Sequence, residues 1–262
     1  MRENSLRAVW AQRGVALGGW LTLPSSMSAE IMANVGFDWV CVDMQHGMIG
    51  FAEMVRMLQG ISTTDTVPLV RVPRNEPGII GRSLDAGAWG VVVPMVNSRQ
   101  EAEAAVAACR YAPVGIRSYG PLRANYYAGF DYFSRANREV TCIVMIETEE
   151  AVDNVEAIVS VPGIDVVYIG PADLGVSLGL PPAPDHPEPI FTEALDRVLD
   201  ACRRHDVVPG IAGNAHTAVK RVEQGFQLVE VASDAGLLAL GAGNALQQVR
   251  PTAGPAPKSA YL

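Results

Sequence analysis

The feature that most constrains this chain is an alternation of short β-rich runs with longer amphipathic stretches. Eight apolar runs predict strands, at residues 16–21, 38–42, 67–72, 90–93, 140–146, 165–169, 207–211 and 227–231. Between them, apolar residues recur at helical spacing, as in the stripe of Phe51, Met54, Val55, Leu58 and Ile61. Eight β/α units predict a closed (β/α)8 TIM barrel of parallel strands. A doubly wound open sheet is the alternative, but no G-x-G-x-x-G motif follows any run.

The length of the chain suits one such barrel. A (β/α)8 domain commonly has about 250 residues, and this chain has 262, of which 49% are apolar. We therefore expect residues 1–250 to form a single domain that ends in a helix over 237–249. Residues 251–262 are expected to be a flexible tail.

Residues 110–139 interrupt the alternation. This stretch contains five of the seven tyrosines and several turn-forming residues, among them Pro113, Gly115, Gly120 and Pro121. Long insertions in compact domains are usually either functional or disordered, and the aromatic residues favour order. The stretch is therefore predicted to be a lid-like insertion.

Charge and hydropathy exclude several classes of protein. Acidic residues outnumber basic ones, 28 to 20, which opposes nucleic-acid binding because such binding needs a basic surface. The apolar runs are far too short to span a membrane, and no apolar signal segment follows the N-terminus, so we expect a cytoplasmic protein. The four cysteines lie far apart without a CxxC pair, which indicates free thiols and not disulfides or zinc ligands.

The chain has only two lysines, Lys220 and Lys258. Schiff-base catalysis requires a desolvated lysine in the active site. Lys220 falls inside a predicted surface helix and Lys258 in the tail, so neither ends a predicted strand. The sequence therefore argues against a Schiff-base enzyme.

Polar residues at the carboxyl ends of the predicted strands mark the candidate site, because barrel enzymes build their active sites there. The ionisable residues in these positions are Asp43, His46, Arg71, Glu147 and Asp173. They follow four different strands, so only the closed barrel would bring them together. The sequence predicts an active site at that mouth.

Glu147 and Asp173 are candidates for a divalent metal site. Mg²⁺ and Mn²⁺ prefer oxygen ligands and are often held by one or two carboxylates, with waters and substrate as the remaining ligands. The alternative is that each carboxylate merely caps the helix that it precedes. The occurrence of both at one mouth favours the metal.

Arg71 and His46 each allow two interpretations. The Arg71 guanidinium could bind a carboxylate or a developing enolate oxygen, or it could form a salt bridge that closes the barrel rim. His46 could be a base that the Asp43 carboxylate orients, or an ordinary loop histidine. Without a catalytic lysine, enolate chemistry at a 2-oxo acid would use a metal ion to polarise the keto oxygen.

At these residues the chain resembles the HpcH/HpaI aldolase family of metal-dependent, class II pyruvate aldolases. The resemblance extends from about Gly18 to Ala235. Well-studied members have Glu where this chain has Gln45, and they often have Gln where it has Met145. The resemblance rests on Phe37-Asp38-Trp39-Val40, Asp43-Met44-Gln45-His46, Val70-Arg71, Leu84-Asp85-Ala86-Gly87-Ala88, Val93-Pro94-Met95-Val96, Arg110-Tyr111-Ala112-Pro113-Val114-Gly115-Ile116-Arg117, Ile146-Glu147-Thr148 and Tyr168-Ile169-Gly170-Pro171-Ala172-Asp173-Leu174.

The resemblance implies a barrel of the phosphoenolpyruvate/pyruvate type that reversibly cleaves a 4-hydroxy-2-oxo acid. The products would be pyruvate, or a close 2-oxo acid, and an aldehyde, formed through a metal-bound enolate. Glu147 and Asp173 would hold Mg²⁺, Mn²⁺ or Co²⁺. Arg71 would neutralise the enolate, and His46, paired with Asp43, would transfer protons.

The resemblance also implies substrate contacts and an assembly. Backbone amides near Ala172 and Asp173 would bind the pyruvate carboxylate, and Gln45 and Ala212 would complete the substrate-binding set. Family members form homo-oligomers, and we expect a hexamer or a trimer of dimers in which the last helix packs on a neighbouring barrel. The further candidate site residues are Asp85, Arg117 and Arg123.

Two other functions stay open at this point. One is a metal-dependent decarboxylase or a CoA-ester lyase of the same superfamily. A CoA substrate would need a basic groove for its phosphates, for which Arg117 and Arg123 are the obvious candidates. The other is a catalytically silent barrel that acts as a binding protein. Such a protein would have no reason to keep all four of Glu147, Asp173, Arg71 and His46.

Overall fold

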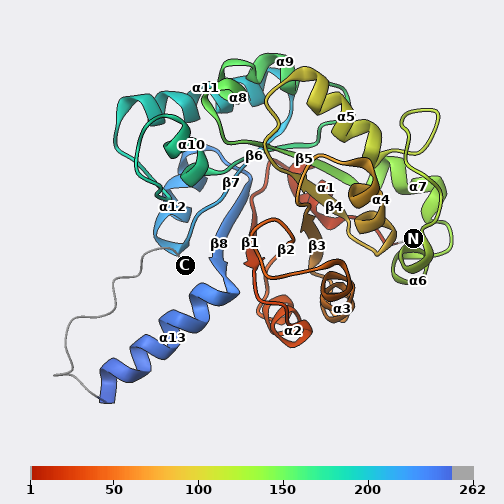
Figure 1. The fold of residues 1–262 in the computed structure, drawn as a ribbon, viewed down its shortest axis with the longest axis horizontal. Helices are drawn as coiled ribbons and strands as arrows, with labels where there is room; N and C mark the ends of the chain where they lie inside the picture. Colours follow the sequence, from red (N-terminus) through yellow and green to blue (C-terminus); the bar gives the residue numbers. More distant parts are fainter. Residues whose placement is uncertain (1, 250–262) are drawn as a thin grey trace.

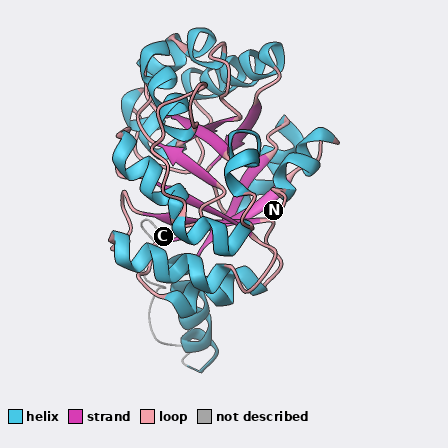
Figure 2. Ribbon diagram, turned by 90° about the vertical axis from the view of Figure 1, so that its right-hand side faces the viewer, coloured by secondary structure: helices cyan, strands magenta, loops and turns pink. Residues whose placement is uncertain are grey.

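A computed structural model describes residues 2–249 and contains the predicted barrel. Eight parallel strands close on themselves in sequence order, and helices surround them (Figures 1 and 2). The open-sheet alternative is therefore wrong, because β1 pairs with β8. The strands are β1 (Ala16–Leu21), β2 (Trp39–Asp43), β3 (Val67–Arg71), β4 (Gly90–Val93), β5 (Thr141–Ile146), β6 (Val166–Ile169), β7 (Val208–Ile211) and β8 (Leu228–Ser233).

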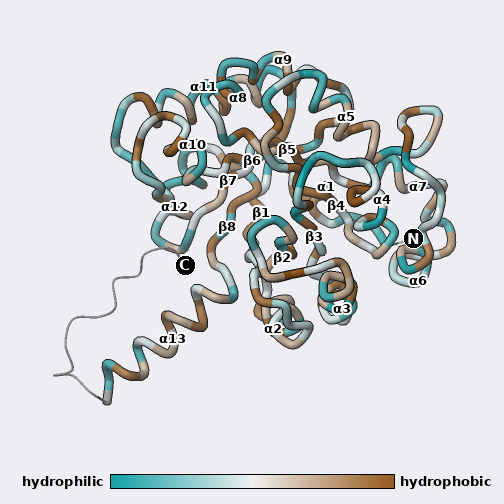
Figure 3. Tube along the Cα trace, in the orientation of Figure 1, coloured by the Kyte–Doolittle hydropathy of each residue, from teal (hydrophilic) through white to brown (hydrophobic). Residues whose placement is uncertain are grey.

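Each strand lies within two residues of its predicted limits. β4 has the predicted bounds, whereas β8 continues two residues further, to Ser233. Every residue of β2 to β6 is buried. Burial of both faces is typical of parallel strands that have helices outside and packed side chains inside, and Figure 3 shows the hydrophobic strands enclosed by more hydrophilic helices.

The helices alternate with the strands, and local signals set their ends. The Ser98 hydroxyl accepts a hydrogen bond from the Glu101 amide, and the Glu101 carboxylate accepts one from the Ser98 amide, which forms the predicted capping box. Pro77 opens α4, where the missing N–H is not needed. The helices outside the 110–139 stretch are α1 (Ser5–Ala11), α2 (Ser26–Asn34), α3 (Phe51–Ile61), α4 (Pro77–Asp85), α5 (Arg99–Cys109), α8 (Glu149–Asp153), α9 (Val155–Val159), α10 (Pro171–Ser177), α11 (Pro189–His205), α12 (Ala215–Gln224) and α13 (Asp234–Val249).

Aromatic side chains fill the barrel interior beneath the carboxyl ends of the strands. Trp20 stacks on Tyr168 with ring centroids 5.6 Å apart, and Trp39 meets both rings edge-on. Gly18 makes room for this packing, since a Cβ at that position would lie 2.1 Å from the Trp39 indole. The Arg71 guanidinium lies 5.1 Å from the Trp20 ring centroid. The aromatic cluster therefore forms the apolar floor of the mouth.

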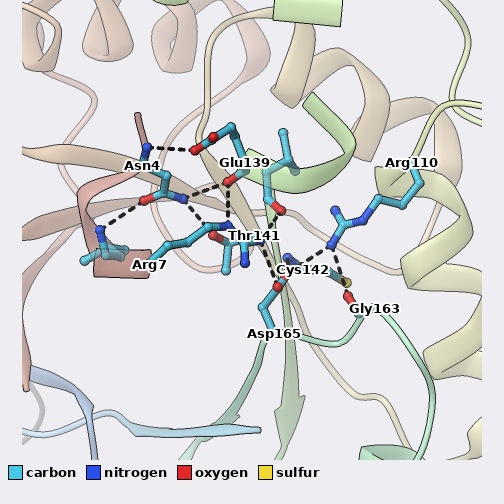
Figure 4. Close-up of polar contacts among 10 residues, drawn as sticks. Asn4, Arg7, Arg110, Glu139, Thr141, Cys142, Gly163 and Asp165 are labelled. Atoms are coloured by element: carbon cyan, nitrogen blue, oxygen red, sulfur yellow. Dashed lines mark hydrogen bonds and ion pairs between the residues drawn. The ribbon is translucent and has the colours of Figure 1, made fainter. Parts of the chain in front are cut away.

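A polar network ties the amino-terminal helix to the opposite end of the barrel (Figure 4). The Asn4 side chain donates to Thr141 Oγ1 at 2.8 Å, at the start of β5. The Asp165 carboxylate, directly before β6, accepts from Arg7, Arg110 and the Cys142 amide at 2.8 to 2.9 Å. Barrel enzymes build their active sites at the other end, so polar residues at this end typically stabilise the fold.

The 110–139 stretch is ordered but is not a lid over the mouth of its own barrel. It forms α6 (Leu122–Ala128) and α7 (Tyr132–Glu139). Its last residue, Glu139, accepts a hydrogen bond from the Asn4 amide, and the Ala128 carbonyl accepts one from the Arg2 amide. The stretch connects α5 to the start of β5, so topology places it at the amino-terminal end of the strands. The stretch therefore does not cover the mouth of this barrel, and a lid-like role for it stays a prediction.

Helix α13 projects away from the barrel (Figure 1). It begins at Asp234, whose carboxylate accepts hydrogen bonds from the Thr22 amide and the Ser28 hydroxyl. Beyond this anchor the helix exposes Leu237, Leu238, Leu240 and Leu246. None of the helices in the described part of the chain combines the length and the apolar character that crossing a bilayer requires. The predicted tail at 251–262 lies outside the described residues.

Candidate active site

The mouth of the barrel collects the predicted ionisable residues from separate strands. Asp43 ends β2, Arg71 ends β3, and Glu147 follows β5. Asp173 lies in the first turn of α10, directly after β6. The charges of Arg71 and Asp173 both act on the Glu147 carboxyl, so the barrel brings this group of residues together as expected.

Asp43 and Arg71 form a buried, two-pronged ion pair. Arg71 Nε donates to Asp43 Oδ1 at 2.9 Å, and Arg71 Nη2 donates to Oδ2 at 2.6 Å. Burial alone would raise the pKa of Asp43, but the hydrogen bonds and the charge of Arg71 outweigh burial and lower this pKa below its ordinary value. The salt-bridge interpretation of Arg71 is therefore correct, although its Nη1 makes no hydrogen bond within residues 2–249 and stays available to a ligand.

His46 is exposed and does not receive the predicted contact from Asp43. Asp43 Oδ1 accepts hydrogen bonds from the backbone amides of Gln45 and His46, at 2.9 and 3.2 Å. The imidazole itself has no hydrogen bond to a described residue. Because Arg71 occupies the carboxylate, the expectation that Asp43 orients the imidazole was wrong, and Asp43 instead shapes the loop that carries it.

Glu147 is a buried carboxyl with one oxygen left unpaired. Its Oε1 accepts a hydrogen bond from the Met95 amide at 2.7 Å, whereas Oε2 is sealed from solvent without a partner. Burial, together with the charge of Asp173, raises the pKa of Glu147 to about 7. Met95 adopts a left-handed backbone, with φ 55°, which is costly for a residue with a side chain. This strained turn directs the amide at Glu147, and sequence patterns did not reveal it.

The start of α10 lies against Glu147. A Cβ at Gly170, the residue before this helix, would lie 2.6 Å from Glu147 Oε2, so only glycine permits this close approach. No side chain caps α10, whereas Thr148 caps α8 by accepting from the Ala151 amide. Neither Glu147 nor Asp173 therefore acts as a helix cap, and the capping alternative does not explain them.

The donor set fits a hard divalent cation. Glu147 Oε2 lacks the partner that a buried polar atom normally has, and the exposed Asp173 adds a second carboxylate. Among residues 2–249, no group of three or more His, Cys, Asp or Glu side chains is arranged to hold a metal ion, but Mg²⁺ is often held by one or two carboxylates. A cation here would give Oε2 its partner and favour the ionised form of Glu147.

The expected substrate-binding residues border the same mouth. Gln45 Oε1 is buried without a hydrogen-bond partner, which leaves an acceptor free beside the Asp43–Arg71 pair. The Ala212 amide donates to the Ile169 carbonyl at 3.0 Å, which holds the end of β7 against β6. Ala172 lies half-buried in the uncapped first turn of α10.

The remaining three candidates lie elsewhere. Arg117 pairs with Asp85 at 2.7 Å and donates to Tyr132 Oη at 3.0 Å. Arg123 donates to the Ala86 carbonyl at 2.6 Å, after the last turn of α4. These contacts hold the 110–139 stretch against the end of the barrel far from the mouth. Asp85, Arg117 and Arg123 therefore do not line the mouth of this barrel, and a site role for them stays a prediction.

Two further residues, Lys220 and Glu230, have places in the structure that matter for the site. The sequence analysis did not identify Glu230 as a residue of the mouth. Lys220 pairs with Asp185 at 2.6 Å on the outer surface of α12, away from the mouth, and Lys258 is outside the described residues. Glu230 of β8 is buried within interaction range of Arg71 and Asp43. Its signal in the sequence is a single acidic residue within the apolar run 227–231.

Comparison with known proteins agrees with this geometry. The HpcH/HpaI aldolase/citrate lyase family profile matches residues 17–240. A hydroxypyruvate/pyruvate aldolase of Rhizorhabdus wittichii is 38% identical over 94% of this chain and 99% of its own length. A 5-keto-4-deoxy-D-glucarate aldolase of Shigella boydii is 35% identical over 89% and 91%.

A solved structure supports the same assignment. A HpcH/HpaI aldolase/citrate lyase family protein of Burkholderia cenocepacia superposes with a TM-score of 0.88 and 35% identity, covering 94% of this chain and 99% of that one. The match therefore extends over nearly the whole barrel at both the sequence and the structural level. The chain belongs to the HpcH/HpaI aldolase/citrate lyase family.

Proposed function

We propose that this protein is a carbon–carbon lyase that reversibly cleaves a 4-hydroxy-2-oxo acid to pyruvate, or a close 2-oxo acid, and an aldehyde. The observation that carries the proposal is the unpaired, buried Oε2 of Glu147 beside the Asp43–Arg71 ion pair. The aldolase relatives, which match nearly the whole chain, support it. The placement of Lys220 on the outer surface supports a mechanism without a Schiff base.

Glu147 and Asp173 would hold the divalent cation that this chemistry uses, with Mg²⁺, Mn²⁺ and Co²⁺ as candidates. Such a cation polarises a keto oxygen and stabilises the negative charge that develops when an enolate forms. The two carboxylates leave coordination positions for water and a 2-oxo acid. Met95 keeps Glu147 in place, because its amide holds Oε1 and leaves Oε2 free.

The other residues of the mouth bind and orient the substrate. Arg71 Nη1 is the free cationic donor for the enolate oxygen, and Asp43 fixes the guanidinium through its two hydrogen bonds. The uncapped amides of Ala172 and Asp173 would bind the substrate carboxylate. Exposed His46 would exchange protons between the third carbon of the substrate and solvent.

The first test follows the methyl signal of pyruvate by proton NMR in D2O, with the protein and added Mg²⁺ or Mn²⁺. Loss of the signal that stops on addition of EDTA is expected, because enolate formation exchanges the methyl protons. Glu147→Gln should abolish the exchange, whereas Glu149→Gln, in the exposed first turn of α8, should not. Failure to exchange with each metal would contradict a pyruvate enolate.

We further propose that the protein works as a homo-oligomer in the cytoplasm. The exposed leucines of α13 support an assembly in which this helix packs on a neighbouring barrel, as a hexamer or a trimer of dimers. The four buried, free cysteines support a reducing compartment.

A further inference from the structure

Glu230 brings to the mouth a carboxyl that the proposed chemistry does not use. Only 9% of the residue is exposed. Its Oε2 accepts a hydrogen bond from the Gly213 amide at 3.3 Å. Gly213 lies two residues beyond β7, so the carboxyl group lies at the carboxyl end of the barrel, between β7 and β8.

The surroundings of Glu230 contain one cation, which is already committed. Arg71, from β3, is bound in two-pronged fashion by Asp43 of β2. Cys41 of β2 and Tyr168 of β6 also interact with the Glu230 charge. β1 and β7 contain no ionisable side chain. The charged groups of the two neighbouring helices have other partners. On α12, Lys220 and the buried Arg221 both pair with Asp185. At the start of α13, Asp234 accepts hydrogen bonds from the Thr22 amide and the Ser28 hydroxyl.

The surroundings of Glu230 favour its neutral, protonated form. Burial raises its pKa to about 8, and the Gly213 hydrogen bond and the Arg71 charge oppose this effect only in part. A protonated carboxyl can donate one hydrogen bond and accept others. Enzymes use such neutral acids in apolar surroundings as hydrogen-bond donors to substrate oxygens.

One oxygen of Glu230 is left over for a ligand. Oε1 has no hydrogen-bond partner in the described part of the chain. In contrast to Gln45 Oε1 and Tyr168 Oη, it is not sealed from solvent, so a ligand can reach it. The charge of Arg71 acts on both Glu147 and Glu230, so both carboxyls lie near the guanidinium that is assigned to the enolate.

We propose that Glu230 is a specificity-determining residue whose free oxygen hydrogen-bonds a hydroxyl group on the third carbon of the donor 2-oxo acid. This inference rests on the proposed function. That function assigns the keto, enolate and carboxylate oxygens of the donor to other groups, so a hydroxyl on the third carbon is the donor oxygen still without a partner. A neutral acid suits this task, because a hydroxyl both donates and accepts and a neutral group does not repel the anionic donor.

The test compares two donors that differ by this hydroxyl, pyruvate and 3-hydroxypyruvate. Exchange of their C3 protons in D2O is followed by NMR with Mg²⁺, in the wild type, Glu230→Gln and Glu230→Leu. The measured quantity is the donor ratio, which is kcat/KM for 3-hydroxypyruvate divided by kcat/KM for pyruvate. This ratio should be about 3- to 10-fold lower in Glu230→Leu than in the wild type, which corresponds to the loss of one hydrogen bond. Glu230→Gln, which keeps a donor and an acceptor, should largely retain the wild-type ratio.

A pH series separates recognition from mere packing. Between pH 7 and pH 9 the wild type should lose its relative preference for 3-hydroxypyruvate, because Glu230 ionises near pH 8 and then repels the anionic donor. Glu230→Gln has no titrating group at this position, and Glu147 acts on both donors alike, so the ratio in this variant should stay flat. This comparison needs only the isosteric variant, so it holds even if Glu230→Leu does not fold.

The outcomes are distinct. Glu139→Gln, at a buried carboxyl in the far end of the barrel, is the matched control and should leave the donor ratio unchanged. An unchanged ratio in Glu230→Leu, or parallel pH curves for the wild type and Glu230→Gln, would overturn the assignment of Glu230 alone. Absence of exchange with both donors in the wild type would overturn the proposed function and this assignment with it.

Discussion

Three carboxyls at the mouth interact with one guanidinium, and only the carboxyl that it hydrogen-bonds has a lowered pKa. Asp43 takes two hydrogen bonds from Arg71, which lower its pKa. Glu147 and Glu230 are buried without such a partner, and burial raises their pKa values to about 7 and about 8. Chemically similar side chains thus have opposite preferences for the charged form. One charged group that orients Arg71 and one neutral group that can donate a hydrogen bond suit the binding of an anionic substrate.

Within the Asp43–Arg71 ion pair, the substitution Asp43→Asn should strongly destabilise the folded protein. The change keeps the shape of the side chain but leaves the Arg71 charge buried without its counter-charge, which costs about 3–5 kcal/mol in free energy of unfolding. Urea denaturation measures the loss. Glu53→Gln removes the partner of Arg56 in an exposed pair and should cost less than about 1 kcal/mol. Equal losses in the two variants would contradict a buried, structural ion pair.

At the scale of elements, the two ends of each strand have different tasks. The carboxyl ends of β2, β3 and β5 present Asp43, Arg71 and Glu147 to the mouth. The amino ends of β5 and β6 are tied by Asp165 to α1 and α5 through Arg7 and Arg110 (Figure 4). We therefore expect that a strand can be weakened at its amino end without a change in the chemistry at its carboxyl end.

Asp165→Asn tests this division. The variant loses the charge that Arg7 and Arg110 share, and hydrogen bonds to charged groups contribute about 1.5–3 kcal/mol each. We expect a loss of roughly 2–4 kcal/mol in unfolding free energy with an unchanged rate of pyruvate proton exchange. Asp200→Asn, which removes an exposed partner of Arg203, should have little effect on either quantity. A large loss of exchange in well-folded Asp165→Asn would show that the two ends are coupled.

At the scale of the whole molecule, α13 is the element that the barrel leaves uncovered. Leu238 and Leu240 are 66% and 60% exposed, and large exposed apolar patches mark interaction sites. A paired substitution, Leu238→Glu with Leu240→Glu, should reduce the oligomer size measured by light scattering after gel filtration. Val219→Glu, at an equally exposed position on α12, should not. A monomeric wild type, or an unchanged mass in the paired variant, would contradict assembly through α13.

The sequence by itself determined the barrel and the residues at its mouth. Strand and helix periodicities are local properties of the chain, so eight β/α units could be counted and the residues at strand ends, such as Arg71 and Glu147, identified. Absence of a strand-end lysine equally argued against a Schiff base. The structure places Asp43 and Arg71 at the carboxyl ends of their strands and Glu147 directly after β5, as that reasoning requires.

Only the tertiary structure decided which of these groups meet. Arg71 binds Asp43 and leaves His46 unpaired, Glu230 joins the mouth from the last strand, and Arg117 lies at the far end of the barrel. Contacts of this kind join residues that are far apart in the chain, and their geometry depends on strand register, inward or outward orientation and backbone strain such as that at Met95. Periodicity contains none of this information, because it reports which face of an element is buried and not what that face touches.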